Sequence, residues 1–585
     1  MDLDPDAKRR HALRCGGFRM ARNQSLHGRL VAVALTVALA ASAVLAVTPA
    51  GAATGKVGPP PPGLGRGSKA ALAQDSCDKT TKRTSFTNIG TGPYCVNPWK
   101  AGDDNGGATA RGVTATEVKV VVYIPTEAQL AAQRQAGSSG PINQVTGQPG
   151  TWPDNFRDFD TVYQHAIKEF GTYQLWGREP VYEFVEASGS DEASQRADAL
   201  EVISKKPFMV IDAFHQSLGA PVFESEMAKA KIIVNGAAAT SLTQADLQKQ
   251  APYRWATQSD STASLYLVSS FLSTITKGKA EHAGDPALQS KTRAFGLITP
   301  QGSLDVDLLK EQLEENKVSA PVTEVTYDNA ASTTFDEVAR THVARMQSEG
   351  VTSVILFATQ GMIRSLMAAA TSNNFKPEWI MTGYQFSDFD GYVRNWDQEQ
   401  ASHAFGVGVL NPLVTGTSAT TGPFQWYWGT KQGTISATGS GWFGFIYNGI
   451  QNAGPKLTVE NFKKGMFSTP ANGGASDGTV TFQTGYGRTV GLPYDEYFGL
   501  GTDVAMIWYN PDITGGANAV ASAVGTGKWM YLNDGHRFSF GSFPKNAKFF
   551  DMSASVAEVP RTATYEKGVA PVPNPCTGCP STAAQ

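Results

Sequence analysis

The sequence lacks the short motifs that carry most enzyme chemistry. Its 585 residues contain no H-E-x-x-H zinc motif and no Walker A phosphate loop, and no G-x-G-x-x-G follows the first expected strand. It has eight histidines and no cysteine–histidine cluster, so we expect no metal site and no cofactor. These absences count against an enzyme without excluding one.

An excess of positive charge is also missing. The chain carries 49 Lys and Arg residues against 52 Asp and Glu residues, for a formal net charge of −3. This balance supplies no basic face for nucleic acid. The apolar fraction is 41% and the chain is too long for one core, so we expect a folded protein of two or more domains.

The N-terminus is typical of an export signal. The apolar run from Leu30 to Val47 follows two arginines and precedes the small residues Ala50-Gly51-Ala52. This pattern predicts a signal peptide over residues 1–52 that is cleaved near Ala52, and hence an extracytoplasmic protein, either secreted or in the cell envelope. A membrane anchor is the alternative interpretation, and translation could begin at Met20 rather than Met1.

Cysteines are few, and an even number remains after the expected cleavage. These are Cys77, Cys95, Cys576 and Cys579, and an oxidising compartment would pair them. Four cysteines allow three pairings, and proximity favours Cys77–Cys95 and Cys576–Cys579. A redox or metal role for the second pair, which lies in the Pro-rich "PVPNPCTGCP", is the alternative.

From Thr114 onward, apolar strands alternate with amphipathic helices. The pattern begins with "VKVVVYIP", includes "FMVIDAFHQSLGAPVF", and restarts after "YRWATQSDS". Such alternation predicts βαβ units, and two successive runs predict an α/β protein with two Rossmann-like lobes, parallel sheets and a cleft between the lobes. The expected divisions are a signal peptide (1–52), a linker with a Cys-stapled extension (53–111), lobe 1 (112–258), lobe 2 (259–403), completion of lobe 1 (404–498), completion of lobe 2 and the hinge (499–550), and a tail (551–585).

Small and amide side chains follow the expected strands. The loops are "IPTE", "FHQS" and "NGAAAT" in the first run, and "TPQGS", "ATQG" and "TGYQ" in the second. The carboxyl ends of parallel strands are where ligands bind in open α/β sheets. A cleft between two such edges could hold one small polar molecule.

These stretches resemble the type 1 periplasmic-binding-protein family. The likeness is narrower to the branched-chain amino acid (Leu/Ile/Val-type) substrate-binding proteins of ABC importers, and it covers roughly Gly112 to Pro544. It implies two lobes joined by a three-segment hinge, closure on a small-molecule ligand, and partnership with ABC transporter permease subunits. We expect a monomer with no catalytic residue. A sensor that presents the solute to a receptor is the alternative in the same fold, and a secreted α/β hydrolase is a rival from another class.

The resemblance also implies which residues bind the ligand. Loops matching "FHQS" and "NGAAAT" hold the carboxylate of an amino acid in that family, and one acidic residue of lobe 2 usually meets the ammonium. At the position of that acidic residue this chain has Tyr384 and Gln385, and Asp388 and Asp390 follow slightly beyond. An ammonium group buried without a carboxylate partner is costly, so an amino acid ligand is in doubt. Amides, carboxylates, polyols or aromatic acids fit equally well. The candidate ligand-binding residues are Trp152, Phe214, His215, Gln216, Ser217, Ala237, Ala239, Thr240, Gln301, Gln360, Tyr384 and Gln385.

Three of these candidates have structural alternatives. Trp152 could be packed between a loop and a helix rather than lie in a cleft. His215 could be an ordinary loop histidine, and Ser217 could be a helix N-cap. By its helical spacing, the aromatic stripe in "GWFGFIYNG" is expected to be core.

Overall fold

The structure is a computed structural model that describes most of residues 58–560. The residues outside this description are 1–57, 85–92, 136–140, 142–149, 215–219, 237–241, 258, 303, 330, 416–426, 428–436, 470, 472, 475–479, 481–482, 484, 488–491, 493–495, 515–524 and 561–585. The expected signal peptide and the pair Cys576 and Cys579 therefore lie outside it. Among the described residues, no helix is both long and apolar enough to cross a membrane.

Lobe 1 is built on a five-stranded parallel sheet in the order β4-β3-β5-β6-β7. Counted within the lobe, this order is 2-1-3-4-5, the flavodoxin-like arrangement of doubly wound sheets. The elements of lobe 1 are β3 (Glu117–Ile124), α2 (Glu127–Gln135), α3 (Trp152–Phe170), β4 (Glu179–Glu186), α4 (Glu192–Ser204), β5 (Met209–Asp212), α5 (Pro221–Lys229), β6 (Ile233–Gly236), α6 (Gln244–Lys249), β7 (Arg254–Ala256), α15 (Ala437–Ala453) and α16 (Val459–Phe467).

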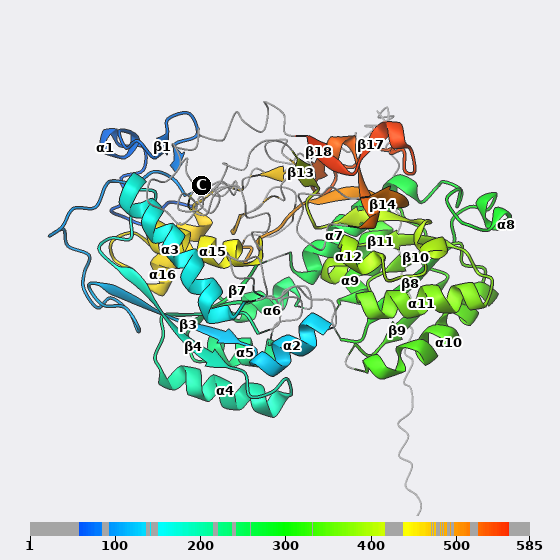
Figure 1. Ribbon diagram of the computed structural model, residues 1–585. Coiled ribbons are helices and arrows are strands. Elements are labelled where there is room, and N and C mark those ends of the chain that lie inside the picture. Colours follow the sequence, from blue (N-terminus) through cyan, green and yellow to red (C-terminus); the bar gives the residue numbers. More distant parts are fainter. Residues whose placement is uncertain are drawn as a thin grey trace, which may run out of the picture. The chain divides into compact units, whose positions relative to one another are not determined.

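The period of two along β3 explains how the sheet is covered. Val120 and Val122 face a core built with α3, α15 and α16, whereas Val121 and Tyr123 face a second core built with α4 and α5. Lobe 1 is thus a three-layer α/β/α structure (Figure 1). The aromatic stripe of α15 lies in the first core, as its spacing predicted.

Lobe 2 repeats the same strand order and then extends it. Strands β9-β8-β10-β11-β12 are parallel neighbours, again 2-1-3-4-5, and β14, β15, β16 and β17 continue the nine-stranded sheet in antiparallel pairing. Helices α10 and α11 pack on one face, and α7 and α9 on the other. The strands are β8 (Phe295–Pro300), β9 (Thr323–Tyr327), β10 (Ser353–Leu356), β11 (Glu378–Met381), β12 (Ala404–Gly408), β14 (Val504–Thr514), β15 (Thr526–Leu532), β16 (Arg537–Phe538) and β17 (Ser555–Val556).

Helices precede and separate the parallel strands of lobe 2. They are α7 (Ser261–Ile275), α8 (Pro286–Gln289), α9 (Val306–Glu315), α10 (Phe335–Ser348), α11 (Gln360–Ser372), α12 (Asp390–Val393) and α13 (Gln398–Ala401), with short 3₁₀ turns at Ser332–Thr334, Tyr384–Phe386, Asn533–Gly535 and Met552–Ala554. Aspartates cap several of them. The side chain of Asp260, for example, accepts a hydrogen bond from the backbone N–H of Ala263 at the start of α7.

The chain passes between the two sheets three times. It leaves lobe 1 after β7, returns after β12 to place α15 and α16 on the first sheet, and goes back with β14. The first and third crossings are hydrogen-bonded, because Ala256 N–H donates to Phe498 O (2.9 Å) and Ser259 Oγ donates to Gly501 O (2.8 Å). Three crossings are what the resemblance implied.

Two of the expected divisions differ from the structure. β12 pairs with β11 in lobe 2, although residues from 404 onward were expected to complete lobe 1. The expected tail contributes β17 to lobe 2, and its strand β18 (Glu558–Pro560) pairs with β13 (Leu413–Thr415). The sequence of a short buried strand such as β12 does not indicate which sheet the strand joins, because its residues are apolar in either case. Only the hydrogen-bonded pairing with a neighbouring strand shows this.

The stapled extension is more firmly packed than a linker. Leu64 and Val96 are buried in the core of lobe 1, and the guanidinium of Arg66 donates to Ser468 Oγ (2.9 Å) and Asn452 Oδ1 (3.0 Å). The extension holds α1 (Lys69–Leu72), β1 (Cys77–Asp78) and β2 (Arg83–Thr84). A disulfide joins Cys77 to Cys95, the pair that proximity favoured, with an S–S distance of 1.98 Å.

Replacing both Cys77 and Cys95 by serine is expected to lower the free energy of unfolding by about 3 kcal/mol, because the bond closes a loop between cysteines 18 residues apart. Urea denaturation measures this loss. Limited proteolysis should then cut first between residues 58 and 111, while ligand binding is retained because the candidate loops are elsewhere. Two free thiols in the unreduced protein, found by mass spectrometry, would contradict the prediction.

Candidate functional site

Each sheet has a topological switch point, where ligands bind in open α/β folds. In lobe 1 it lies between β3 and β5, and in lobe 2 between β8 and β10, because the strand order reverses there. The segment after β5 contains the "HQS" candidates, and the segments after β8 and β10 contain Gln301 and Gln360. The remaining loop candidates follow β6 and β11, the fourth parallel strand of each lobe. In lobe 2, Gln301 thus follows the first parallel strand in chain order, Gln360 the third, and Tyr384 and Gln385 the fourth.

Half of the predicted ligand residues lie outside the described part of the chain. They are His215, Gln216, Ser217, Ala237, Ala239 and Thr240. The residues that begin and end the first of these segments are described, since Phe214 and Ala220 are both buried. Gly236, which precedes the second segment, is the last residue of β6.

Trp152 and Phe214 are core residues. Trp152 begins α3, is 2% exposed, and packs against Trp442 of α15 with ring centroids 5.3 Å apart. Phe214 is 5% exposed and lies 5.4 Å from the ring of Tyr123. For Trp152, the alternative interpretation, a side chain packed between elements, is the one that the structure supports.

Gln301 and Gln360 are accessible at the edge of lobe 2. Gln301 is exposed directly after β8, and Gln360 is half-buried as the first residue of α11. The backbone N–H of Thr359, at the start of this helix, donates to Tyr327 Oη (3.0 Å), and burial raises the pKa of Tyr327 to about 12. The start of α11 thus joins a hydroxyl, an amide side chain and helix N-terminal N–H groups.

Tyr384 and Gln385 form a tight turn after β11. Both are buried, at 3% and 6% exposure, and Gln385 Nε2 lies 3.4 Å from Tyr384 Oη. Gln385 and Phe386 have φ of +48° and +58°, the left-handed region that non-glycine residues avoid. Such strain persists where the surrounding structure enforces it and is concentrated at ligand sites.

The two aspartates after this turn each accept a backbone hydrogen bond, and the buried Asp388 Oδ1 has no hydrogen-bond partner among the described residues. Asp388 Oδ2 accepts a hydrogen bond from Leu410 N–H (2.7 Å), and Asp390 Oδ1 accepts one from Trp529 N–H (2.9 Å). Burial raises the pKa of Asp388 to about 7, so much of this carboxyl is neutral near neutral pH. Asp390 also lies 3.8 Å from Lys528 Nζ.

The sequence-based reasoning missed a buried charged cluster in lobe 1. We call Asp212, Glu224 and Arg254 the carboxylate cluster; they are 1–2% exposed and come from β5, α5 and β7. Arg254 donates to Glu224 Oε2 from Nη2 (2.6 Å) and Nε (2.9 Å). An aspartate within the apolar "MVID" was the available signal, but only the fold places its partners beside it.

The described residues assemble no metal site. No group of three or more His, Cys, Asp or Glu side chains in the described part of the chain could hold a metal ion. A G-x-S-x-G string, the sequence pattern of a hydrolase nucleophile elbow, occurs at Gly474–Gly478, and its residues 475–478 lie outside the described part of the chain.

Comparisons with known proteins find similarity to solved structures alone. No protein-family model and no curated protein matches the sequence. Among solved structures, a leucine-, isoleucine-, valine-, threonine- and alanine-binding protein from Brucella ovis, in a closed conformation, is similar at 13% identity and a TM-score of 0.47, over 79% of this chain and 99% of that chain. A fatty acid ABC transporter substrate-binding protein from Thermomonospora curvata is similar at 14% identity and a TM-score of 0.44, over 74% and 97%. A solute-binding protein of an ABC transporter from Rhodopseudomonas palustris BisB5, in complex with 3,4-dihydroxybenzoic acid, is similar at 10% identity and a TM-score of 0.42, over 72% and 98%.

Proposed function

We propose that the protein is an extracytoplasmic solute-binding protein that delivers a small polar ligand to the permease of an ABC importer. The observation that carries this proposal is the pair of sheets with the same 2-1-3-4-5 order, linked by three crossings of the chain. Each sheet has a switch point with polar residues beside it, so a ligand that bridges the two lobes would favour their closed arrangement. The expected export signal agrees with this role.

The proposed ligand carries a carboxylate or neutral polar groups, without an ammonium group. Of the lobe 2 carboxylates considered for an ammonium, Asp390 is engaged by Trp529 and Lys528, and Asp388 is 2% exposed and accepts a hydrogen bond from the N–H of Leu410. Burying an ammonium without a charged partner costs several kcal/mol, about as much as a typical ligand gains. The amide of Gln385 and the hydroxyl of Tyr384 suit a hydroxyl or carbonyl instead.

A thermal-shift screen with matched pairs of compounds tests the function and the ligand class together. The pairs are leucine with 4-methylpentanoate and phenylalanine with 3-phenylpropanoate, beside sugars, amides and hydroxybenzoates. We expect saturable stabilisation by a deaminated acid or neutral compound, about 2.7 kcal/mol at a ligand concentration 100 times Kd. The amino acid of the same pair should give no shift.

A Gln385→Glu variant sharpens this test. The new carboxylate would stand where Gln385 now offers an amide, so binding should shift toward the amino acid of each pair. Stabilisation of the unaltered protein by leucine but not by 4-methylpentanoate would overturn the ligand class. If no compound of the panel stabilises the protein, the solute-binding function itself is contradicted.

A further inference from the structure

We propose that the outer edge of β4 in lobe 1 is a docking surface for an extended segment of another protein, with basic residues at both ends and β-branched residues between them. The segment would join the five-stranded sheet as a further strand, held by backbone hydrogen bonds. The inference goes beyond the solute-binding function and does not depend on it, because no candidate ligand residue lies on β4.

Strand β4 has a neighbouring strand on one side only. It is the first strand in the order β4-β3-β5-β6-β7, and all eight of its residues pair in parallel with β3. The N–H of Glu179 donates to Thr116 O (2.9 Å), and the N–H of Ala187, just after the strand, donates to Ile124 O (2.8 Å). Because successive N–H groups of a strand point to opposite sides, the odd-numbered residues of β4 face β3 and the even-numbered ones face away from the sheet.

Three backbone donors therefore stand along the outer edge. They are the N–H groups of Tyr182, Phe184 and Glu186, and within the described part of the chain none of them has a hydrogen-bond acceptor. Pro180, the other even-numbered residue, has no N–H to offer. A row of unpaired N–H and C=O groups at a sheet edge is a template for another strand.

The side chains of β4 are also more accessible than those of the next strand. Tyr182 and Phe184 are half-buried, whereas Val120 and Val122, which pair with them in β3, are fully buried. Val181, on the opposite face of β4, is 44% exposed. The edge thus offers apolar surface beside its free backbone groups.

Helices hold β4 in place on both of its faces. On one face, Tyr182 Oη donates to Asp160 Oδ1 of α3 (3.0 Å). On the other face, Lys205 Nζ, just after α4, lies 2.7 Å from Glu183 Oε1. The strand is therefore fixed in position before any segment binds.

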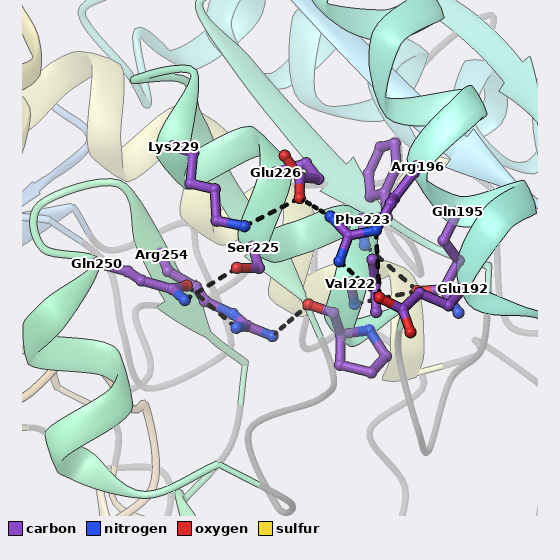
Figure 2. Close-up of polar contacts among 11 residues, drawn as sticks. Glu192, Gln195, Arg196, Val222, Phe223, Ser225, Glu226, Lys229, Gln250 and Arg254 are labelled. Atoms are coloured by element: carbon purple, nitrogen blue, oxygen red, sulfur yellow. Dashed lines mark hydrogen bonds and ion pairs between the residues drawn. The ribbon is translucent and has the colours of Figure 1, made fainter.

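Helix α4 is in turn fixed to α5. Figure 2 shows the ion pair between Arg196 of α4 and Glu226 of α5. It also shows Gln195, whose Oε1 accepts hydrogen bonds from two N–H groups at the start of α5. An edge that needs no further ordering lowers the cost of association.

The charges of β4 indicate the chemistry of the segment. All its charged residues are acidic, namely Glu179, Glu183 and Glu186. Glu183 is paired with Lys119 and Lys205, whereas Glu179 and Glu186 are exposed at the two ends and form no ion pair with a described residue. Because opposite charges across neighbouring strands stabilise a sheet, a segment with basic ends fits this edge.

A second copy of this chain is the less suitable occupant. If two β4 strands paired antiparallel through all three N–H groups at their longest overlap, Glu183 would stand directly opposite the Glu183 of the other copy. Like charges directly opposite each other destabilise a sheet. Strand β9, the corresponding edge of lobe 2, has five residues against the eight of β4 and offers fewer backbone hydrogen bonds.

Two matched peptides test the proposal on the full chain. The first is Lys-Val-Thr-Val-Thr-Val-Thr-Lys, blocked at both termini, and the second has glutamate in place of both lysines. Isothermal titration calorimetry should show saturable one-to-one binding of the lysine peptide. The glutamate peptide should bind at least about fivefold more weakly, because two attractive pairs become repulsive. No binding of the lysine peptide, or equal binding of both, would overturn the proposal.

Hydrogen exchange with single-residue resolution locates the bound peptide. The lysine peptide should slow exchange at the N–H groups of Tyr182, Phe184 and Glu186. The N–H groups that already donate to β3 should exchange slowly with and without the peptide. Slower exchange in β9 in place of β4 would assign the site to lobe 2 and overturn the proposal.

Two substitutions of one exposed residue isolate the backbone contribution. Glu186→Pro removes the charge and one outward N–H, whereas Glu186→Ala removes the charge alone. Proline is tolerated at edge positions, as Pro180 shows, so both variants should keep the urea midpoint of the unaltered protein. The proline variant should bind the lysine peptide about 2- to 10-fold more weakly than the alanine variant. Equal affinities would overturn strand pairing as the mode of binding.

Sedimentation of the protein alone tests the choice of occupant. We expect no self-association that depends on β4. A dimer of the unaltered protein that Glu186→Pro dissociates and Glu186→Ala does not would assign this edge to a second copy and overturn its assignment to another protein.

Discussion

Replacing Arg537 with alanine is expected to lower the free energy of unfolding by about 3–5 kcal/mol. Arg537 Nε donates to Asp503 Oδ1 (2.9 Å), and both side chains are fully buried. Its Nη atoms donate to the carbonyl oxygens of Leu410 (3.0 Å) and Val409 (3.1 Å). The variant leaves the charge of Asp503 buried without its partner, which costs more than the lost hydrogen bonds alone.

The position of Arg537 adds a local consequence. Val409 and Leu410 lie where the chain leaves β12, and Asp503 lies where it enters β14. The guanidinium of Arg537 therefore forms hydrogen bonds with both the second and the third segment that connect the two lobes. Urea denaturation measures the loss of stability. The exposed pair Arg345–Glu349 supplies the control, because Arg345→Ala should cost at most about 1 kcal/mol. Equal losses for the two variants would contradict the role of Arg537.

Arg178→Ala is expected to cost about 4 kcal/mol and to release the extension from lobe 1. Arg178 is 1% exposed and donates to four backbone carbonyl oxygens, at 2.6–3.1 Å. The acceptors belong to Asn105, Gly107, Thr114 and Pro455. Hydrogen bonds from a charged donor contribute about 1.5–3 kcal/mol each and are not additive, and water recovers part of the loss.

Limited proteolysis and urea denaturation together check this prediction. Residues 58–111 should become sensitive to protease before lobe 2 does. Arg157→Ala provides a matched control, because Arg157 is an exposed arginine of α3 that pairs with Asp154. If Arg178→Ala lowers stability while the extension stays resistant, Arg178 supports lobe 1 and does not hold the extension.

The sequence carried enough information for the parallel strands and their helices. The run that forms β3 is rich in β-branched residues, and α4 begins after Asp191, whose side chain accepts a hydrogen bond from the N–H of Ser194. Periodicity and caps are local properties, so they are visible without the fold. The membership of β12 was not visible, because it depends on pairing with β11.

The candidate site was predictable to a lesser degree. Strand ends located Gln301, Gln360 and the turn at Tyr384, since the edge of a parallel sheet follows from strand direction. The carboxylate cluster was not found, because Asp212, Glu224 and Arg254 meet only when three elements pack. For Trp152 the sequence left a cleft position and a packed position open, because its core neighbour Trp442 is distant in the sequence.

The contacts of the extension also set an order of events in time. Arg66 binds Ser468 across 402 residues and Asn452 across 386, while Gln451 Nε2 donates to Tyr94 O across 357. Contacts this far apart in the sequence form slowly, since the intervening chain must be brought together first. During synthesis, the segment around Arg66 therefore cannot form these contacts until residue 468 has been made. Lobe 1 begins first and finishes late, after the parallel strands of lobe 2 have already been made.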